Sequence, residues 1–387
     1  MRYRIPNYAV LDLAKTAAAA INVYAKEHDR QPMTAALNKI LKTTGTDKLN
    51  PLVLNYQAIL EYLLGKYDQS LEHLNQQLKN SEISNNKIFD EIKVNIGVVR
   101  YHQLYRDLIS YGIMPDQRKK IEEIVSLIFP GVVRPRLIFP PKGDVIWFAE
   151  RESITARLFT LGCIPATDGK ALRESAGESA DLMSSYAKAI EHAQEVLQLK
   201  RPSRLSPKEQ DGWRQARARA HNARGRAEMY HTDHFYYLGK KLPRLQAALK
   251  DLEWATSEFT NEISYKCDVA ACHMRLGYWW AQSEALDVQH DLDAGATFEA
   301  ESPEAVASET EFKMAEEQLK NIVEQHFPEN GYGLFELGRV YRLLGRFNEA
   351  EKQLEQSLKI PENERGFSIP RVQREVELTK EKSLIYP

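Results

Sequence analysis

The chain has 387 residues, of which 27% are charged and 43% are hydrophobic. This length exceeds a single compact core, so we expect two or three domains or one elongated repeat array, and the composition excludes collagen-like, low-complexity and wholly disordered proteins. The three cysteines, Cys163, Cys267 and Cys272, cannot form a complete set of disulfides and suit a reducing compartment. No apolar run approaches the ~20 residues that span a bilayer. We therefore expect a cytoplasmic protein with no membrane contact.

Apolar residues recur at spacings of three and four along nearly the whole chain, which predicts an all-α protein. The N-terminal helical region covers residues 1–130. Within it the pattern predicts helices at 7–28, 34–42, 89–111 and 116–129, together with a helical hairpin at 51–79.

Residues 131–150 depart from this pattern. Val132 to Phe139 and Val145 to Phe148 form two apolar runs around the sequence Pro-Pro-Lys-Gly-Asp, which indicates a short β-hairpin or an extended connector. We expect it to separate the N-terminal region from a C-terminal helical array over residues 151–387.

Charge is divided unevenly within the C-terminal array. Residues 200–250 contain thirteen Lys or Arg against four Asp or Glu, whereas residues 251–330 contain four basic residues against eighteen acidic ones. Residues 284–311 are acidic, have few large apolar side chains and include Gly295 and Pro303. They indicate a mobile acidic insertion between two helices, and we hypothesise that it occupies the basic surface within the same chain.

Two segments share one local pattern. Tyr62 to Leu74 and Arg342 to Leu354 each contain Leu-Leu-Gly, a basic residue and an aromatic residue, followed by a small residue three positions later. Glycine permits the left-handed turn after a helix, and the small residue lets the next helix approach closely. Each segment is therefore predicted to be an antiparallel helical hairpin.

This pattern resembles the tetratricopeptide repeat (TPR), a helical hairpin of 34 residues. The C-terminal copy matches at Leu334, Leu337, Gly338, Tyr341, Leu344, Gly345, Phe347, Ala350, Leu354 and Ser357, with Pro361 closing the unit. The first copy departs from the family pattern at Gln57, Ala58 and Glu61. The resemblance implies a superhelical α-solenoid of TPR-like hairpins that binds a protein or peptide through its first helices and performs no catalysis.

The predicted helix over 208–230 carries the first candidate binding surface. Trp213, Ala216, Ala220, Ala223, Ala227 and Tyr230 form an apolar stripe, and Arg214, Arg217, His221 and Arg224 flank it. This basic edge suits an acidic protein or peptide partner. A nucleic acid is the alternative, because aromatic residues follow at 235–237 and could stack on bases. Solvated arginines without a partner are the remaining interpretation.

The last repeat carries the second candidate surface. Tyr332, Phe335, Arg339 and Arg342 share a helix face opposite the apolar residues Leu334, Leu337, Tyr341 and Leu344. In a TPR-like array, the first helix of a repeat offers this face to the binding groove. Exposed aromatics beside arginines are typical of interfaces, so we expect these four residues to contact a partner.

Sequence motifs for chemistry are weak or absent. Cys267, Cys272 and His273 lie on different faces of one helix and cannot converge on an ion, and His231, Asp233 and His234 read as a polar turn. We predict no cofactor, no metal site and no enzymatic activity. A hydrolase would need carboxylates that converge in a deep pocket. The oligomeric state is left open.

Overall fold

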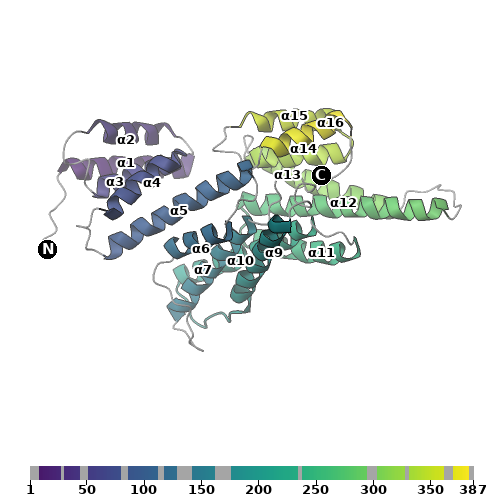
Figure 1. Cartoon of the computed structure of the whole chain (residues 1–387), viewed down its shortest axis with the longest axis horizontal. Coiled ribbons are helices and arrows are strands. Elements are labelled where there is room, and N and C mark those ends of the chain that lie inside the picture. The colour runs from purple at the N-terminus through teal and green to yellow at the C-terminus, as the bar shows by residue number, and fades with distance from the viewer. Residues whose placement is uncertain are drawn as a thin grey trace. The chain divides into compact units, whose positions relative to one another are not determined.

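The computed structural model describes residues 8–27, 30–43, 51–79, 86–111, 117–128, 142–161, 176–233, 238–293, 303–326, 331–360 and 369–382. These residues form helices joined by turns, with no strand among them, which confirms the all-α prediction (Figure 1). None of the helices within these ranges has the length and apolar character that crossing a membrane requires. The chain divides into two compact units, residues 1–106 with 119–135 and residues 107–118 with 136–387.

The first unit is built from short amphipathic helices. They are α1 (Tyr8–Glu27), α2 (Gln31–Lys42), α3 (Pro51–Leu63), α4 (Tyr67–Lys79), most of α5 (Asn86–Tyr111) and most of α6 (Gln117–Ile128). Leu13, Met33, Leu37, Ile40 and Leu60 bring α1, α2 and α3 together in one core. A second core joins α3, α4 and α5.

The second unit is a series of helical hairpins. Its helices are α7 (Lys142–Leu161), α9 (Ala176–Gln198), α10 (Pro207–Thr232), α11 (Leu238–Glu258), α12 (Ile263–Asp293), α13 (Pro303–Lys320) continuing into the π-helical turn η2 (Asn321–His326), α14 (Gly331–Leu343), α15 (Phe347–Leu358) and α16 (Ile369–Lys380). Consecutive helices pack on one another, and the first helices α7, α10, α12 and α14 also touch in succession. This is the packing of a helical-repeat solenoid.

The two Leu-Leu-Gly segments form the same turn. Gly65 and Gly345 have φ angles of 78° and 72°, in the left-handed region that favours glycine. At the first turn, the Lys66 amide donates to the Glu61 carbonyl at 2.8 Å, and at the second the Arg346 amide donates to the Tyr341 carbonyl at 2.8 Å. Both turns end one helix and begin the next, which confirms the two predicted hairpins.

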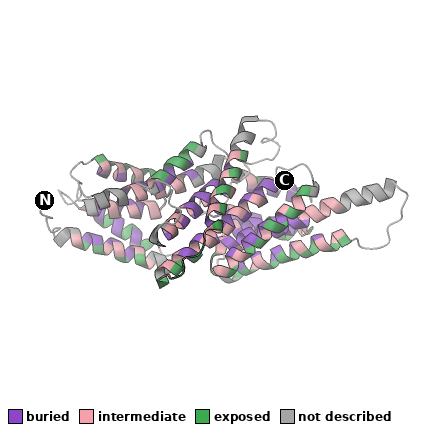
Figure 2. Ribbon diagram, turned by 90° about the horizontal axis from the view of Figure 1, so that it is seen from below, coloured by how far each residue is buried: buried purple, intermediate pink, exposed green. Residues whose placement is uncertain are grey.

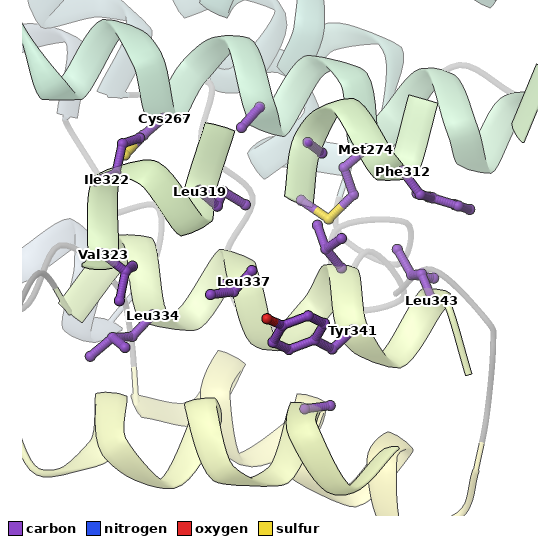
Figure 3. Packing of buried hydrophobic residues seen from close by; sticks show 14 of the residues in the cluster. Cys267, Met274, Phe312, Leu319, Ile322, Val323, Leu334, Leu337, Tyr341 and Leu343 are labelled. Carbon is purple, nitrogen blue, oxygen red and sulfur yellow. The ribbon is translucent and has the colours of Figure 1, made fainter. Parts of the chain in front are cut away.

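Apolar stripes hold these hairpins together. Buried residues follow one side of the helices, while exposed residues follow the other (Figure 2). The cluster in Figure 3 joins α12, α13, η2 and α14 through Cys267, Met274, Phe312, Leu319, Ile322, Leu337 and Tyr341. Each hairpin thus buries its apolar face against the apolar face of the neighbouring hairpin.

The predicted connector at 131–150 is partly wrong. Helix α7 begins at Lys142, so the second apolar run is helical, whereas residues 132–141 lie outside the described ranges. Ile146 and Ala149, three positions apart, belong to one core with Trp213 and Ala216 of α10. A short apolar run cannot distinguish a strand from a buried helix segment, and contact with α10 selects the helix.

The predicted mobile acidic insertion at 284–311 is also wrong for most of its length. Helix α12 continues to Asp293 and α13 begins at Pro303, and only residues 294–302 lie outside the described ranges. The Ser308 hydroxyl donates to the Gly277 carbonyl at 2.8 Å, and Phe312 is buried in the adjoining core. The acidic residues at 303–311 therefore extend a hairpin, and this part packs on α12.

A histidine–carboxylate pair ties together each of four described hairpins. In every pair the histidine Nδ1 donates to a carboxylate oxygen, at 2.8 Å for His73 and Glu61, 2.5 Å for His192 and Glu152, 2.8 Å for His221 and Asp251, and 2.6 Å for His273 and Glu311. The pairs join α4 to α3, α9 to α7, α10 to α11 and α12 to α13 respectively. They add directional polar contacts to packing that is otherwise apolar.

The α3–α4 pair predicts a pH-dependent stability for the first unit. The hydrogen bond to Glu61 raises the pKa of His73 and outweighs the lowering effect of burial. This raised pKa contributes stability that is fully present below the ordinary histidine pKa and is lost as pH rises through the folded-state value.

We expect His73→Gln to accelerate hydrogen exchange in α3 and α4 strongly at about pH 5.5 and only weakly at about pH 8.5, relative to the unmodified chain at the same pH. Gln76→Ala, which changes an exposed residue of α4, serves as the control and should have little effect at either pH. An equal effect of His73→Gln at both values would contradict the proposed charge on His73.

Candidate functional site

Helix α10 begins with a complete capping box. Ser206 accepts a hydrogen bond from the Glu209 amide, the Glu209 carboxylate accepts one from the Ser206 amide, and Pro207 occupies the first turn. The predicted apolar stripe is buried along its whole length, at Trp213, Ala216, Ala220, Ala223, Ala227 and Tyr230. The cap and the stripe fix both the start and the rotation of α10, and the arginines are therefore carried on its two edges.

A close approach brings α11 against one edge of α10. A Cβ added to Gly225 would lie 2.7 Å from Leu252 Cγ and 2.9 Å from the Ala248 carbonyl oxygen. Both distances are shorter than a real Cβ atom allows. The backbones of α10 and α11 can therefore approach this closely because residue 225 is glycine and has no side chain beyond a hydrogen. This approach places the carboxylates of α11 within reach of the predicted basic edge.

Three of the four predicted residues on this edge contact α11 carboxylates. Arg224 binds Asp251 with two nitrogens, at 2.6 Å and 2.7 Å, and Arg214 donates to Glu258 Oε2 at 3.0 Å. His221 donates to Asp251 as described above. We call Arg214, Arg217, His221 and Arg224 the α10 basic edge.

Asp251 is the shared carboxylate partner of His221 and Arg224 on this edge. Burial would raise its pKa, but the hydrogen bonds from Arg224 and His221 outweigh burial and hold the pKa below its ordinary value. Asp251 is therefore an anion locked between two basic groups. Basic residues of the 200–250 segment thus pair with acidic residues of the following segment inside the molecule. The two segments therefore do not form separate solvated faces.

Arg217 differs from its neighbours. Its Nη1 donates to the Leu197 carbonyl of α9 at 3.3 Å, and its Cζ lies 5.9 Å from the centre of the Trp254 ring. Among the described residues, no carboxylate forms an ion pair with it. Burial and the nearby charge of Arg224 both lower the pKa of Arg217. The structure thus holds a half-buried guanidinium in place beside a second one.

The opposite edge of α10 faces the interior of the second unit. Arg226 Nε lies 3.4 Å from Asp268 Oδ1 of α12, and Asn222 donates to Asp268 Oδ2 at 2.8 Å. Burial raises the pKa of Asp268 despite these partners. Arg219 donates to Gln215 within α10 at 2.9 Å. The contacts of Arg226 and Asn222 join α10 to α12, so this edge is structural.

The second candidate surface, on α14, is covered. Arg339 and Arg342 are 2% and 0% exposed, and Phe335 is 0% exposed, while Tyr332 is half-buried and packs against two cores. Glu375 of α16 accepts hydrogen bonds from Arg339 Nε at 2.9 Å and from Arg342 Nε at 2.8 Å. The predicted exposure of this face is wrong because α16 packs over it and neutralises its arginines.

Among the described residues, Cys267, Cys272 and the polar turn show no common metal-binding centre. Cys267 and Cys272 are buried thiols whose pKa values are raised by burial, and His273 pairs with Glu311. Asp233 binds Arg275, and His234 lies outside the described residues.

Metal-ligand side chains meet elsewhere, at Glu152 of α7 and His192 and Glu195 of α9. This group was not predicted from the sequence, although the spacing His192-x-x-Glu195 puts two ligand types on one helix face.

No family model matches this sequence, and no curated protein matches it. The solved structures that are similar to this chain include the following two. A monomeric mutant of IFIT1 with Gppp-AAAA matches with a TM-score of 0.41 and 11% identity, over 91% of this chain and 72% of that chain. Yeast Tom70 matches with a TM-score of 0.21 and 11% identity, over 97% of this chain and 95% of that chain. Both TM-scores lie below 0.5, so neither likeness supports a conclusion about this chain.

The packing of α16 predicts a large effect of Glu375. Removing its charge leaves Arg339 and Arg342 buried with less compensation, which costs about 3 kcal/mol in comparable buried pairs. We expect Glu375→Gln to lower the free energy of unfolding by about this amount, measured by urea unfolding with circular dichroism. Glu377→Gln changes an exposed carboxylate of the same helix and should have little effect. Equal unfolding curves for the two variants would contradict the covering role of α16.

The α10 basic edge predicts a similar dependence on Asp251. Asp251→Asn removes the anion between Arg224 and His221, and we expect a loss of about 2 kcal/mol in the free energy of unfolding. Glu253→Gln, at an exposed position of α11, is the matched control. A loss no larger than that of Glu253→Gln would show that Asp251 does not organise the edge.

Proposed function

We propose that this chain is a non-catalytic binding scaffold whose α10 basic edge holds an acidic segment of a protein partner. The observation that supports this most is Arg217, a positioned guanidinium next to Arg224 that forms no ion pair with a carboxylate among the described residues. A carboxylate of a partner would fill that role.

The surroundings of Arg217 suit this task. A guanidinium presents its donors in a planar fork that matches a carboxylate, and less entropy is lost when the fork is already held in place. The Leu197 carbonyl and the Trp254 ring hold Arg217.

A nucleic acid is the alternative partner for helix 208–230. Its phosphates would need several uncompensated basic residues, but Arg214, Arg224 and Arg226 already have carboxylate partners within the chain. The aromatic residues at 235–237 lie outside the described residues. The internal pairing therefore favours an acidic peptide, and a nucleic acid becomes one outcome of the test.

The test measures fluorescence anisotropy with two labelled probes of equal length, an oligoglutamate peptide and an oligouridylate, over a series of salt concentrations. We expect the peptide to bind and Arg217→Ala to weaken its binding about tenfold, which corresponds to about 1.4 kcal/mol. Lys352→Ala removes an exposed charge from α15 and should leave the affinity unchanged.

Two outcomes would contradict the proposal. Equal affinity of the peptide for the Arg217→Ala variant and the unmodified chain would remove Arg217 from the site. Binding of the oligouridylate alone, with a steep linear fall of log affinity against log salt, would indicate a nucleic-acid partner.

A further inference from the structure

The pair between α7 and α9 differs from the other three histidine–carboxylate pairs. Beside His221 and Asp251 lies Arg224, and beside His73 and Glu61 lies the Gln57 amide, which donates to Glu61 Oε1 at 3.0 Å. Beside His192 and Glu152 lies a second carboxylate, that of Glu195. Among the described residues, this is the one group of three or more His, Cys, Asp or Glu side chains whose ligand atoms lie close enough together to hold a metal ion.

The three side chains converge on one point between the helices. One ligand atom from each of Glu152, His192 and Glu195 lies within 4.8 Å of the other two. Glu152 comes from α7, whereas His192 and Glu195 are three positions apart on α9 and share its face. The Phe159 ring lies parallel to the His192 ring, with centroids 5.7 Å apart and planes 5° apart. The ring plane is thus fixed by packing.

The arrangement places the Glu152 carboxylate where water is scarce and a second carboxylate, that of Glu195, close to it. The Glu152 side chain is 1% exposed and that of His192 is 14% exposed. Two carboxylates at such a distance repel each other unless a cation or a shared proton lies between them. Burial raises the pKa of Glu152, but hydrogen bonds to His192 and Glu195 and the charge of Arg151 outweigh burial and lower it.

Arg151 leaves one oxygen of Glu152 for an ion. Arg151 Nη1 donates to Oε1 at 2.8 Å, and His192 Nδ1 lies 2.5 Å from Oε2. An ion bound at Oε2 would replace the proton between Glu152 and His192, while Arg151 would continue to orient the carboxylate from its other oxygen. A charged partner behind a ligating carboxylate is a common support for a metal site.

We propose that Glu152, His192 and Glu195 bind a divalent first-row transition-metal ion of the Zn²⁺ type, which ties α7 to α9. One imidazole and two carboxylates are ligands that Zn²⁺ accepts, and a solvent molecule would complete a tetrahedral shell. Ligand atoms around such an ion lie roughly 3.3 Å apart, so the side chains must draw together slightly on binding. Binding releases protons, since each ligand must be deprotonated.

The experiment titrates the full chain with Zn²⁺ after treatment with a chelator. Calorimetry should show one ion per chain, with a heat that depends on the buffer because protons are released, and thermal unfolding should shift to higher temperature. We expect Glu195→Gln to weaken Zn²⁺ binding at least tenfold. His192→Gln should abolish it.

Matched controls separate this site from general effects. His273→Gln removes a histidine from the α12–α13 pair, which has no third ligand of this kind among the described residues, and it should keep the full Zn²⁺ response. Glu195 is a partly exposed residue of α9, so Glu195→Gln is expected to fold even if His192→Gln does not. Mg²⁺ should give no comparable shift, because it disfavours imidazole ligands.

Three results would overturn the proposal. One is the absence of a Zn²⁺-dependent shift in the unmodified chain. Another is an unchanged affinity in Glu195→Gln. The third is an equal response to Mg²⁺ and Zn²⁺, which would indicate a diffuse attraction of cations to acidic residues.

Discussion

The second unit depends on placing opposite charges between helices that pack too closely for water. A buried guanidinium or carboxylate costs several kcal/mol unless a partner of opposite charge meets it. Asp251 meets Arg224 between α11 and α10, and Glu375 meets Arg342 between α16 and α14. Apolar stripes bring the helices together, and the charges restrict which helix can lie beside which. Part of the uneven distribution of charge along the sequence reflects these ion pairs between helices.

Much of the fold could be predicted because its signals are local. The helical period and the glycines at 65 and 345 are read from a few neighbouring residues, and the turns they predict are present. The segments at 142–149 and 284–311 could not be read in this way. Val145 to Phe148 gains its helical form from α10, and the acidic residues before Phe312 become helical where α13 packs on α12. Both outcomes depend on distant partners.

In the candidate site, too, some features follow from the local sequence and others depend on distant partners. The stripe of α10 and the gathering of Arg214, Arg217, His221 and Arg224 on one edge follow from helical geometry, and the structure places them so. Which of these residues are already paired was beyond the sequence, because the carboxylates come from α11. The face of α14 was misjudged for a related reason, since the sequence gives no sign of which helix covers it.

The second unit contains ion pairs between packed helices, and in our proposal Arg217 receives the charge of a partner. Ion pairs between packed helices, such as Arg224 with Asp251 and Arg342 with Glu375, restrict which helices lie side by side in this unit. A double-mutant cycle with Arg224→Ala and Asp251→Ala, followed by urea unfolding, tests this claim most directly. The account predicts a coupling energy of about 2 kcal/mol in favour of the pair. Strictly additive losses, with a coupling energy near zero, would contradict it.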